Sequence, residues 1–134
     1  MPSDWNAKVI EDFRANDGAV PNFGGPLLLL HTTGARTGRQ HVTPVMYRKV
    51  DGGYAVFASF AGQPRNPAWY HNLVANPDVQ AEIGTQTLLL RARVAGEVER
   101  EPIWTAHKTE FPGFQEYEEK TTRQIPVVIL ERVS

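Results

Sequence analysis

Hydrophobic residues occur along the chain in short runs separated by glycine and proline, and this pattern predicts about six strands. Runs of four to eight apolar or β-branched residues bounded by turn residues are typical of strands. The Asp51-Gly52-Gly53 segment and Gly84 are the strongest turn signals between such runs. The strands are therefore expected at residues 27–32, 41–49, 54–59, 79–83, 87–95 and 125–132.

The first predicted helix begins at Ser3 or Asp4 and ends at about Ala15. Its spacing places four apolar residues on one face, namely Trp5, Val9, Ile10 and Phe13. We expect this face to pack on the rest of the protein. The alternative is association with a membrane surface, which the acidic residues Glu11, Asp12 and Asp17 disfavour.

Further along the chain, three more helical segments are predicted, and Pro44 marks a special position within the second strand. One helix starts at Pro67 with Asn66 as its N-cap and ends near Asn76. The others are expected at 97–108 and 115–122. Because proline has no N–H to donate to a neighbouring strand, Pro44 is expected at a sheet edge or a bulge.

These elements do not alternate as β-α-β units and show no internal repeat, so the expected fold class is α+β with an antiparallel sheet or small barrel. A chain of 134 residues is expected to form one domain, residues 1–134, in which residues 1–25 are an N-terminal helix and linker.

Composition excludes several kinds of chemistry. The chain has no cysteine, hence no disulfide and no thiol nucleophile. The four histidines have no metal-ligand spacing, and each is expected to be a surface residue or a hydrogen-bonded core residue, with no metal site. No secretory signal or membrane-spanning run is visible, which favours a cytoplasmic protein or one peripheral at the inner face of the membrane.

The clearest candidate for a binding site is the turn Gly34-Ala35-Arg36-Thr37-Gly38-Arg39, which follows four consecutive leucines. Glycine turns of this kind orient backbone N–H groups toward anions, and arginine adds planar donors. Between residues 18 and 77 there are five arginines and lysines and one acid, a net charge of +4, although the whole chain is −1. This distribution favours a small polyanionic ligand over nucleic acid. The alternative is a hairpin with solvated charges.

Two aromatic segments accompany the turn. Trp69 and Tyr70 lie beside Asn66, His71 and Asn72 at the start of a predicted helix, and this mixture suits a planar polar ring. Phe111, Phe114 and Tyr117 recur at a helical spacing and form either a core face or the wall of an apolar pocket.

Together, these segments resemble the deazaflavin-dependent nitroreductase family of actinobacteria, whose members use coenzyme F420. The resemblance runs from about Pro26 to the C-terminus. It is carried by Thr-Thr-Gly-Ala-Arg-Thr-Gly-Arg at 32–39, Thr43-Pro44, Asn-Pro-Ala-Trp-Tyr-His-Asn-Leu-Val-Ala-Asn-Pro at 66–77 and Arg-Gln-Ile-Pro-Val at 123–127. It implies a split β-barrel related to flavin mononucleotide-binding barrels.

The resemblance also implies a cofactor site for F420. Residues of the glycine turn would contact its phosphate and polyglutamate end, two strand segments would line the deazaflavin and ribityl chain, and the helix start would close the other side. These residues are Ala35, Arg36, Thr37 and Arg39; His41, Val42, Thr43, Pro44, Val45 and Met46; Phe57, Ala58, Ser59 and Phe60; and Ala68, Trp69, Tyr70, His71 and Asn72.

The implied reaction is hydride transfer from F420H2 to a small planar acceptor such as a quinone or a nitro compound. Ser59 is the expected hydrogen-bond donor near the reacting ring, and Tyr117 is expected to supply a proton or orient the substrate. The expected substrate pocket comprises Met46, Phe111, Phe114 and Tyr117. The best-known nitroimidazole-reducing relative has tyrosines where this chain has Met46, Phe111 and Phe114, and this loss of hydroxyls favours a flat, apolar acceptor. Phe60 stands where relatives carry a basic residue.

Two other functions remain open at this stage: a flavin mononucleotide-dependent oxidoreductase on the same barrel, and a non-catalytic F420 carrier. The protein is expected to be a monomer or homodimer.

Overall fold

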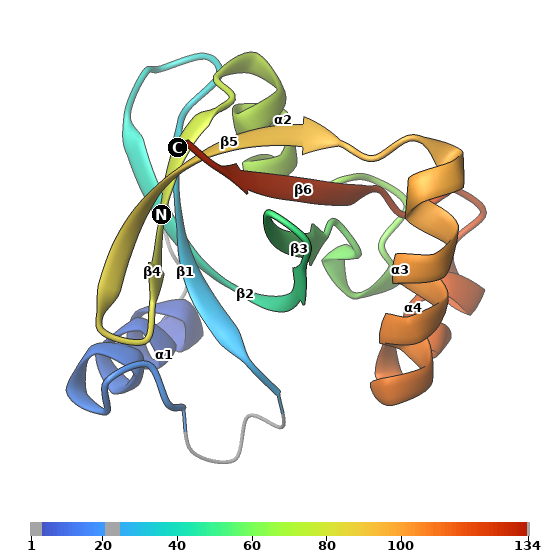
Figure 1. The fold of residues 1–134 in the computed structure, drawn as a ribbon, viewed down its shortest axis with the longest axis horizontal. Helices are drawn as coiled ribbons and strands as arrows, with labels where there is room; N and C mark the ends of the chain where they lie inside the picture. Colours follow the sequence, from blue (N-terminus) through green and yellow to red (C-terminus); the bar gives the residue numbers. More distant parts are fainter. Residues whose placement is uncertain (1–3, 21–24, 134) are drawn as a thin grey trace.

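The computed structural model describes residues 4–20 and 25–133, and six antiparallel strands within them form a closed barrel (Figure 1). The order around the barrel is β1-β2-β3-β6-β5-β4. The α+β split-barrel prediction is therefore confirmed. The strands are β1 (Leu27–Thr33), β2 (Gln40–Val50), β3 (Gly53–Phe57), β4 (Asp78–Ile83), β5 (Gln86–Val94) and β6 (Val127–Arg132).

Strand β2 changes its partner halfway along. Residues 40–46 pair with β1, whereas residues 47–50 pair with β3. Pro44 lies opposite Leu29 in the half that pairs with β1 alone, so its missing N–H removes no bond to a strand on the other side. The predicted edge position of Pro44 is thus confirmed, and the first half of β2 leaves one backbone edge without a partner strand among the described residues.

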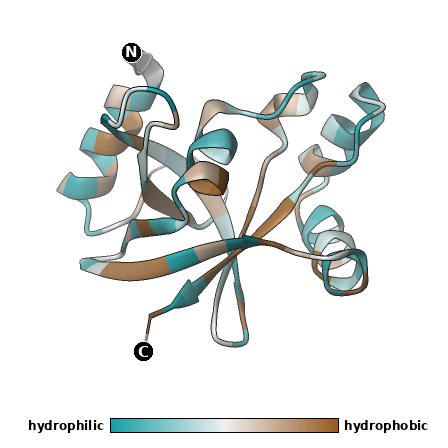
Figure 2. Ribbon diagram, turned by 90° about the horizontal axis from the view of Figure 1, so that it is seen from above, coloured by the Kyte–Doolittle hydropathy of each residue, from teal (hydrophilic) through white to brown (hydrophobic). Residues whose placement is uncertain are grey.

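Four α-helices surround the barrel: α1 (Asp4–Ala15), α2 (Ala68–Ala75), α3 (Glu97–Glu110) and α4 (Gly113–Lys120). Figure 1 shows α1 and the α3–α4 pair on opposite sides of the barrel, with α2 beside the turn that joins β1 and β2. Figure 2 shows hydrophobic bands within the strands, whereas the helices carry mainly hydrophilic residues with shorter hydrophobic bands. All four predicted helical segments are present.

Two local expectations are wrong. Asn66 does not cap α2, because Pro67 is the residue that precedes the first helical turn. The side chain of Asn66 instead accepts a hydrogen bond from Arg123, at 2.7 Å. The third strand ends at Phe57 rather than Ser59, because a short 3-10 turn, η1 (Phe60–Gly62), begins directly after Ser59.

The apolar face of α1 packs on the barrel, as expected. Val9 and Phe13 are buried against Leu27 and Leu29 of β1. Burial of a side chain the size of Phe13 stabilises a fold by about 2 kcal/mol. The side chain of Trp5, the fourth predicted member of this face, lies outside the described residues.

Helices α3 and α4 are joined by polar contacts as well as by packing. The Trp104 indole N–H donates to Glu118 at 2.5 Å, and the Lys108 ammonium lies 2.8 Å from the same carboxylate. The buried Arg100 donates to the Ile125 carbonyl at 3.0 Å. These contacts fix α3 to the segment that leads into β6.

Candidate functional site

A cavity of about 880 Å³ lies between the β1–β2 turn, the first half of β2, the start of α2 and one side of α1. It brings together ten residues predicted from the sequence to bind the cofactor: Ala35, Arg36, Thr37, His41, Val42, Thr43, Ala68, Trp69, His71 and Asn72. Four further residues complete the lining: Asn6, Ile10, Gly34 and Gln40. The contribution of α1 was not predicted, because apolar spacing within a helix does not tell which part of the barrel the helix covers.

The β1–β2 turn is held by its own backbone. The Gly34 N–H donates to the Arg39 carbonyl at 2.7 Å, and the Gly38 N–H donates to the Gly34 carbonyl at 3.0 Å. A Cβ atom on Gly34 would lie 2.8 Å from the Thr37 hydroxyl and 3.2 Å from the His41 ring. Gly34 therefore lets Thr37 and His41 come together at the base of the turn.

Helix α2 is docked on this turn by two asparagines. The Asn72 carbonyl oxygen accepts from the Ala35 N–H at 3.0 Å, and its amide donates to the Thr32 hydroxyl at 3.4 Å. The Asn76 amide donates to the Thr33 carbonyl at 3.3 Å. Because Asn72 is buried, its bond to Ala35 fixes the turn relative to the helix start.

The cavity has a positive electrostatic character. None of the described residues that line it is an aspartate or glutamate. The Arg36 guanidinium lines it and makes no ion pair with any described residue. Ala68 and Trp69 also place the N-terminal end of α2 at the cavity, where free backbone N–H groups and the helix dipole favour anions.

Nine other predicted cofactor residues lie outside the lining: Arg39, Pro44, Val45, Met46, Phe57, Ala58, Ser59, Phe60 and Tyr70. Val45 and Tyr70 pack against the barrel core. Phe57 and Ala58 are buried, and Met46 packs beside the α1 cluster. Ser59 is 8% exposed, and its hydroxyl makes no hydrogen bond in the part of the chain that the structure describes.

The segment around Ser59 is held by Arg123, a residue that the sequence analysis quoted but to which it gave no role. Its guanidinium donates to the carbonyls of Gln63, Ala58 and Ser59 at 3.0, 3.1 and 2.9 Å, besides the bond to Asn66. Burial lowers the pKa of this arginine.

Backbone strain is present in the same segment. Phe60 and Ala61 have φ angles of 47° and 52°, which are unfavourable for residues with a Cβ atom. Strained backbone of this kind persists where surrounding contacts enforce it. The Arg123 guanidinium supplies such contacts.

Three of the four residues predicted to form the acceptor pocket, Phe111, Phe114 and Tyr117, belong to one aromatic cluster around His107. Met46 and Phe111 meet beside Gly25, where a Cβ atom would contact both side chains. Phe114 packs against Tyr117, with ring centroids 5.5 Å apart. All four are half-buried, so the cluster belongs partly to the core and partly to the surface.

His107 lies within this cluster, and its environment differs from the sequence prediction. It is 0% exposed, and neither ring nitrogen has a hydrogen-bond partner in the described structure. Its ring stacks on Phe57 at 3.9 Å and 15°, and lies 5.0 Å from Phe111 and 4.5 Å from Phe114. Burial, assisted by the charge of Arg48, lowers the pKa of His107 to about 4, so the ring is neutral at pH 7.

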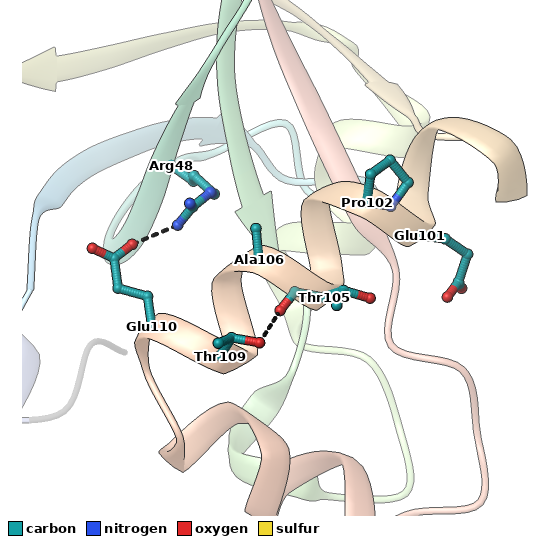
Figure 3. Close-up of a pocket in the computed structure, with 7 residues that line it drawn as sticks. All are labelled: Arg48, Glu101, Pro102, Thr105, Ala106, Thr109 and Glu110. Carbon is teal, nitrogen blue, oxygen red and sulfur yellow. Dashed lines mark hydrogen bonds and ion pairs between the residues drawn. The ribbon is translucent and has the colours of Figure 1, made fainter.

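A second concavity, of about 680 Å³, lies along α3 (Figure 3). Arg48 at one end is paired with Glu110 at 2.6 Å, and Glu101 lies at the other. None of the predicted cofactor or acceptor residues lines it. Because its arginine is already paired and its remaining charges are acidic, it does not suit a polyanion.

The other polar clusters are structural. The Glu82 carboxylate of β4 accepts bonds from Arg14 of α1 at 2.7 and 3.1 Å and lies 2.6 Å from His31 of β1. The bond from Arg14, with that from His31, lowers the pKa of Glu82. Among the described residues, no three histidines or carboxylates are grouped as metal ligands, and no helix has the length and apolarity to cross a membrane.

The chain has relatives among known proteins. Residues 5–132 match the family model described as F420H(2)-dependent quinone reductase. The F420H(2)-dependent quinone reductase Rv1261c of Mycobacterium tuberculosis is 37% identical over 110 residues, covering 80% of this chain and 74% of the relative.

Two solved structures are similar over most of the chain. One, described as an F420-H2 dependent reductase (FDR-A), has a TM-score of 0.72 and 38% identity, covering 84% of this chain and all of that one. The other, described as a domain-swapped dimer, has a TM-score of 0.74 and 36% identity, covering 98% of this chain and all of that one.

Proposed function

The chain belongs to the F420H(2)-dependent quinone reductase family, and on this premise we propose that it reduces flat, apolar acceptors, chiefly quinones, with F420H2 held in the cavity between the β1–β2 turn and α2. It is an oxidoreductase, and its cofactor is coenzyme F420. The observation that carries the proposed site is the convergence of ten predicted cofactor residues on one cavity, whose described lining residues include Arg36 and no acid.

The donor set of this cavity fits the anionic end of F420, which carries a phosphodiester and carboxylates. Arg36 is free to pair with such a group, and the start of α2 offers backbone N–H donors and a favourable dipole. Arg39, exposed on the same turn, would pair with carboxylates beyond the cavity. A volume of about 880 Å³ is in the range of cavities that hold a large cofactor.

The remaining lining residues would hold the ring system. His41, Val42 and Thr43 belong to the half of β2 that has one unpaired edge, and this edge offers backbone groups to the ring edges. Trp69 closes the opposite side and is held there by burial in the barrel core. Asn72 positions both sides relative to each other through its bond to Ala35.

Bound F420H2 would supply a hydride to the acceptor, since a 5-deazaflavin favours two-electron transfer. The protein would orient the acceptor and exclude water from it. Ser59 has a hydroxyl without a partner in the described structure, and it is our candidate for a hydrogen bond to the reacting ring. Tyr117, half-buried beside Phe114, is our candidate for orienting the acceptor or supplying its proton.

The side chains of the acceptor pocket favour quinones over nitro compounds. Met46, Phe111 and Phe114 carry no hydroxyl, so these three side chains give a nitro group no hydrogen bonds in place of those that it loses to water. A flat quinone, by contrast, presents mainly apolar ring area to these side chains. We propose quinone reduction as the main activity and nitro reduction as a weaker one.

A fluorescence titration of the purified protein with F420, and in parallel with flavin mononucleotide, tests the proposal. We expect F420 to bind at micromolar or lower concentration and flavin mononucleotide to bind at least tenfold more weakly. Arg36→Gln should weaken F420 binding about tenfold. The control is Lys49→Gln, which removes an exposed cation from the half of β2 that pairs with β3 and should leave F420 binding unchanged. Tighter binding of flavin mononucleotide would overturn the cofactor assignment.

Enzyme and carrier are separated by a single-turnover experiment. Bound F420H2 should be oxidised by a naphthoquinone at least a hundredfold faster than free F420H2. Equal rates for bound and free cofactor would contradict catalysis while leaving the binding site intact.

A further inference from the structure

We propose that His107 is the polar anchor of the acceptor pocket: its buried imidazole donates a hydrogen bond to a carbonyl oxygen of the quinone that enters among Phe111 and Phe114. The inference rests on the proposed function and adds to it a binding residue for the acceptor. Sequence analysis assigned His107 to a surface or hydrogen-bonded position, and the structure shows neither.

The first argument is the unmet bonding capacity of the ring. Nearly all buried polar groups in folded proteins have a hydrogen-bond partner, and an exception calls for an explanation. Both nitrogens of His107 are such exceptions in the described structure. Burying these atoms unpaired is unfavourable, so an acceptor that supplies a partner recovers a bond that the protein alone cannot make.

The second argument is the position of the ring. His107 contacts Phe111 and Phe114, two of the four residues predicted to form the acceptor pocket, and stacks on Phe57, which is two residues before Ser59. Phe111 and Phe114 are half-buried and contact the buried imidazole, so part of this pair of side chains borders solvent. Rotation of one phenylalanine would open a slot lined by flat aromatic surfaces with one polar group at its base.

The third argument is chemical complementarity. A quinone has large apolar faces and hydrogen-bond acceptors only at its carbonyl oxygens. The cluster offers the matching arrangement, with apolar rings around a single N–H donor. A neutral imidazole also carries one acceptor nitrogen, which could receive the O–H of the hydroquinone product.

The charged groups around the ring set the limit of its role. Burial is the largest effect that opposes protonation of His107, and the charge of Arg48 adds to it. Glu110 favours protonation, but its carboxylate is paired with Arg48 at 2.6 Å. The imidazole is therefore neutral near pH 7 and acts as a hydrogen-bond donor rather than as the source of the proton that the reduced quinone takes up.

The test uses the histidine ring signals of the wild-type protein, labelled with ¹⁵N on its four histidines and observed by NMR. The ligand is oxidised 1,4-naphthoquinone without F420H2, so that no turnover occurs, and the absence of cysteine excludes thiol adducts. We expect a saturable shift of the His107 ring nitrogens. F420 alone should instead shift His41 and His71, which line the cofactor cavity. A quinone titration that leaves the His107 signals unchanged would overturn the inference.

The two sets of signals also separate the failure of this inference from failure of the proposed function. If F420 shifts His41 and His71 but quinone leaves His107 unchanged, the cofactor site stands and the anchor is refuted. If F420 shifts neither, the proposed cofactor site itself fails.

Variants supply a second readout. His107→Phe should raise the KM for naphthoquinone about tenfold while F420 affinity stays within twofold, and His107→Asn, which keeps a donor, should restore part of the loss. Naphthalene, which has the rings but no carbonyl, should inhibit the wild type and His107→Phe equally. If His107→Phe weakened naphthalene inhibition as much as it raised the KM for naphthoquinone, His107 would have a packing role only, and the proposed hydrogen bond would be contradicted.

Discussion

Replacement of Arg123 by methionine is the most demanding stability prediction that the structure supports. The guanidinium donates four hydrogen bonds, to three backbone carbonyls and to Asn66, at 2.7 to 3.1 Å. Methionine preserves much of the length of the side chain and removes every donor. The segment from Ala58 to Asn66 would then lose these four side-chain bonds, while the bond from the Ala58 N–H to the Pro126 carbonyl, at 3.0 Å, would remain.

The expected cost is about 3 kcal/mol. A hydrogen bond to a charged group contributes about 1.5–3 kcal/mol, which would sum to more than 6 kcal/mol for four bonds. The true loss is smaller, because Arg123 is half-buried and the carbonyls of an opened segment can bond to water. The strained φ angles of Phe60 and Ala61 act in the opposite direction, since their relaxation favours the opened segment by about 1 kcal/mol each.

Urea unfolding followed by circular dichroism measures this loss. With a slope of about 1.5 kcal/mol/M, 3 kcal/mol lowers the midpoint by about 2 M. The urea midpoint of Arg123→Lys should lie between those of Arg123→Met and the wild type, because one ammonium cannot reach four acceptors at once. Arg65→Met is the matched control: this exposed arginine contacts the Phe60 ring at 5.7 Å, and its loss should cost less than about 0.5 kcal/mol. A loss below about 1 kcal/mol for Arg123→Met would refute the reasoning.

Four further predictions follow from single contacts. Asn72→Leu should weaken F420 binding about tenfold by releasing the Ala35 N–H, as measured by fluorescence titration, and an unchanged affinity would contradict the positioning role of Asn72. The pKa of His107 is about 4 in the folded protein against an ordinary value of 6.5, so the unfolded protein binds more protons than the folded one between these two pH values. The free energy of unfolding should therefore fall by up to about 3 kcal/mol as pH drops from 6.5 to 4. His107→Phe should flatten that part of a plot of urea midpoint against pH. Glu82→Gln should lower the free energy of unfolding by about 1 kcal/mol or less, because the partners of Glu82 are partly exposed. It should also weaken F420 binding, since Arg14 holds α1, and α1 contributes Asn6 and Ile10 to the cavity. A loss of stability without any change in F420 affinity would show that α1 stays in place. Ser59→Ala should slow single-turnover hydride transfer to naphthoquinone about tenfold with little change in F420 affinity, and an unchanged rate would remove Ser59 from the mechanism.

The sequence leaves two states of assembly, monomer and homodimer, and light scattering of the purified protein distinguishes them.

Local patterns in the sequence predict the strands, the helices and a candidate anion-binding turn. The strands and helices followed from local properties, namely apolar periodicity and the turn preferences of glycine and proline, which act within a few residues. The sequence predicts one site from the turn that contains Arg36 and the helix that contains Asn72 only through the family resemblance. Apolar periodicity relates residues a few positions apart and does not tell which distant segments meet.

The surroundings of His107, Arg123 and α1 follow from the tertiary structure and from no local sequence pattern. His107 lies on α3 at a position that the helical spacing of the sequence allows to be either exposed or buried. Its burial against Phe57, with neither ring nitrogen bonded in the described structure, follows only from the packing of distant segments. The four acceptors of Arg123 all lie 57 to 65 residues away in the sequence, in one segment whose path no local pattern fixes. Hydrogen bonds and burial between distant segments depend on the closure of the barrel, and local sequence patterns carry no information about which segments that closure brings together.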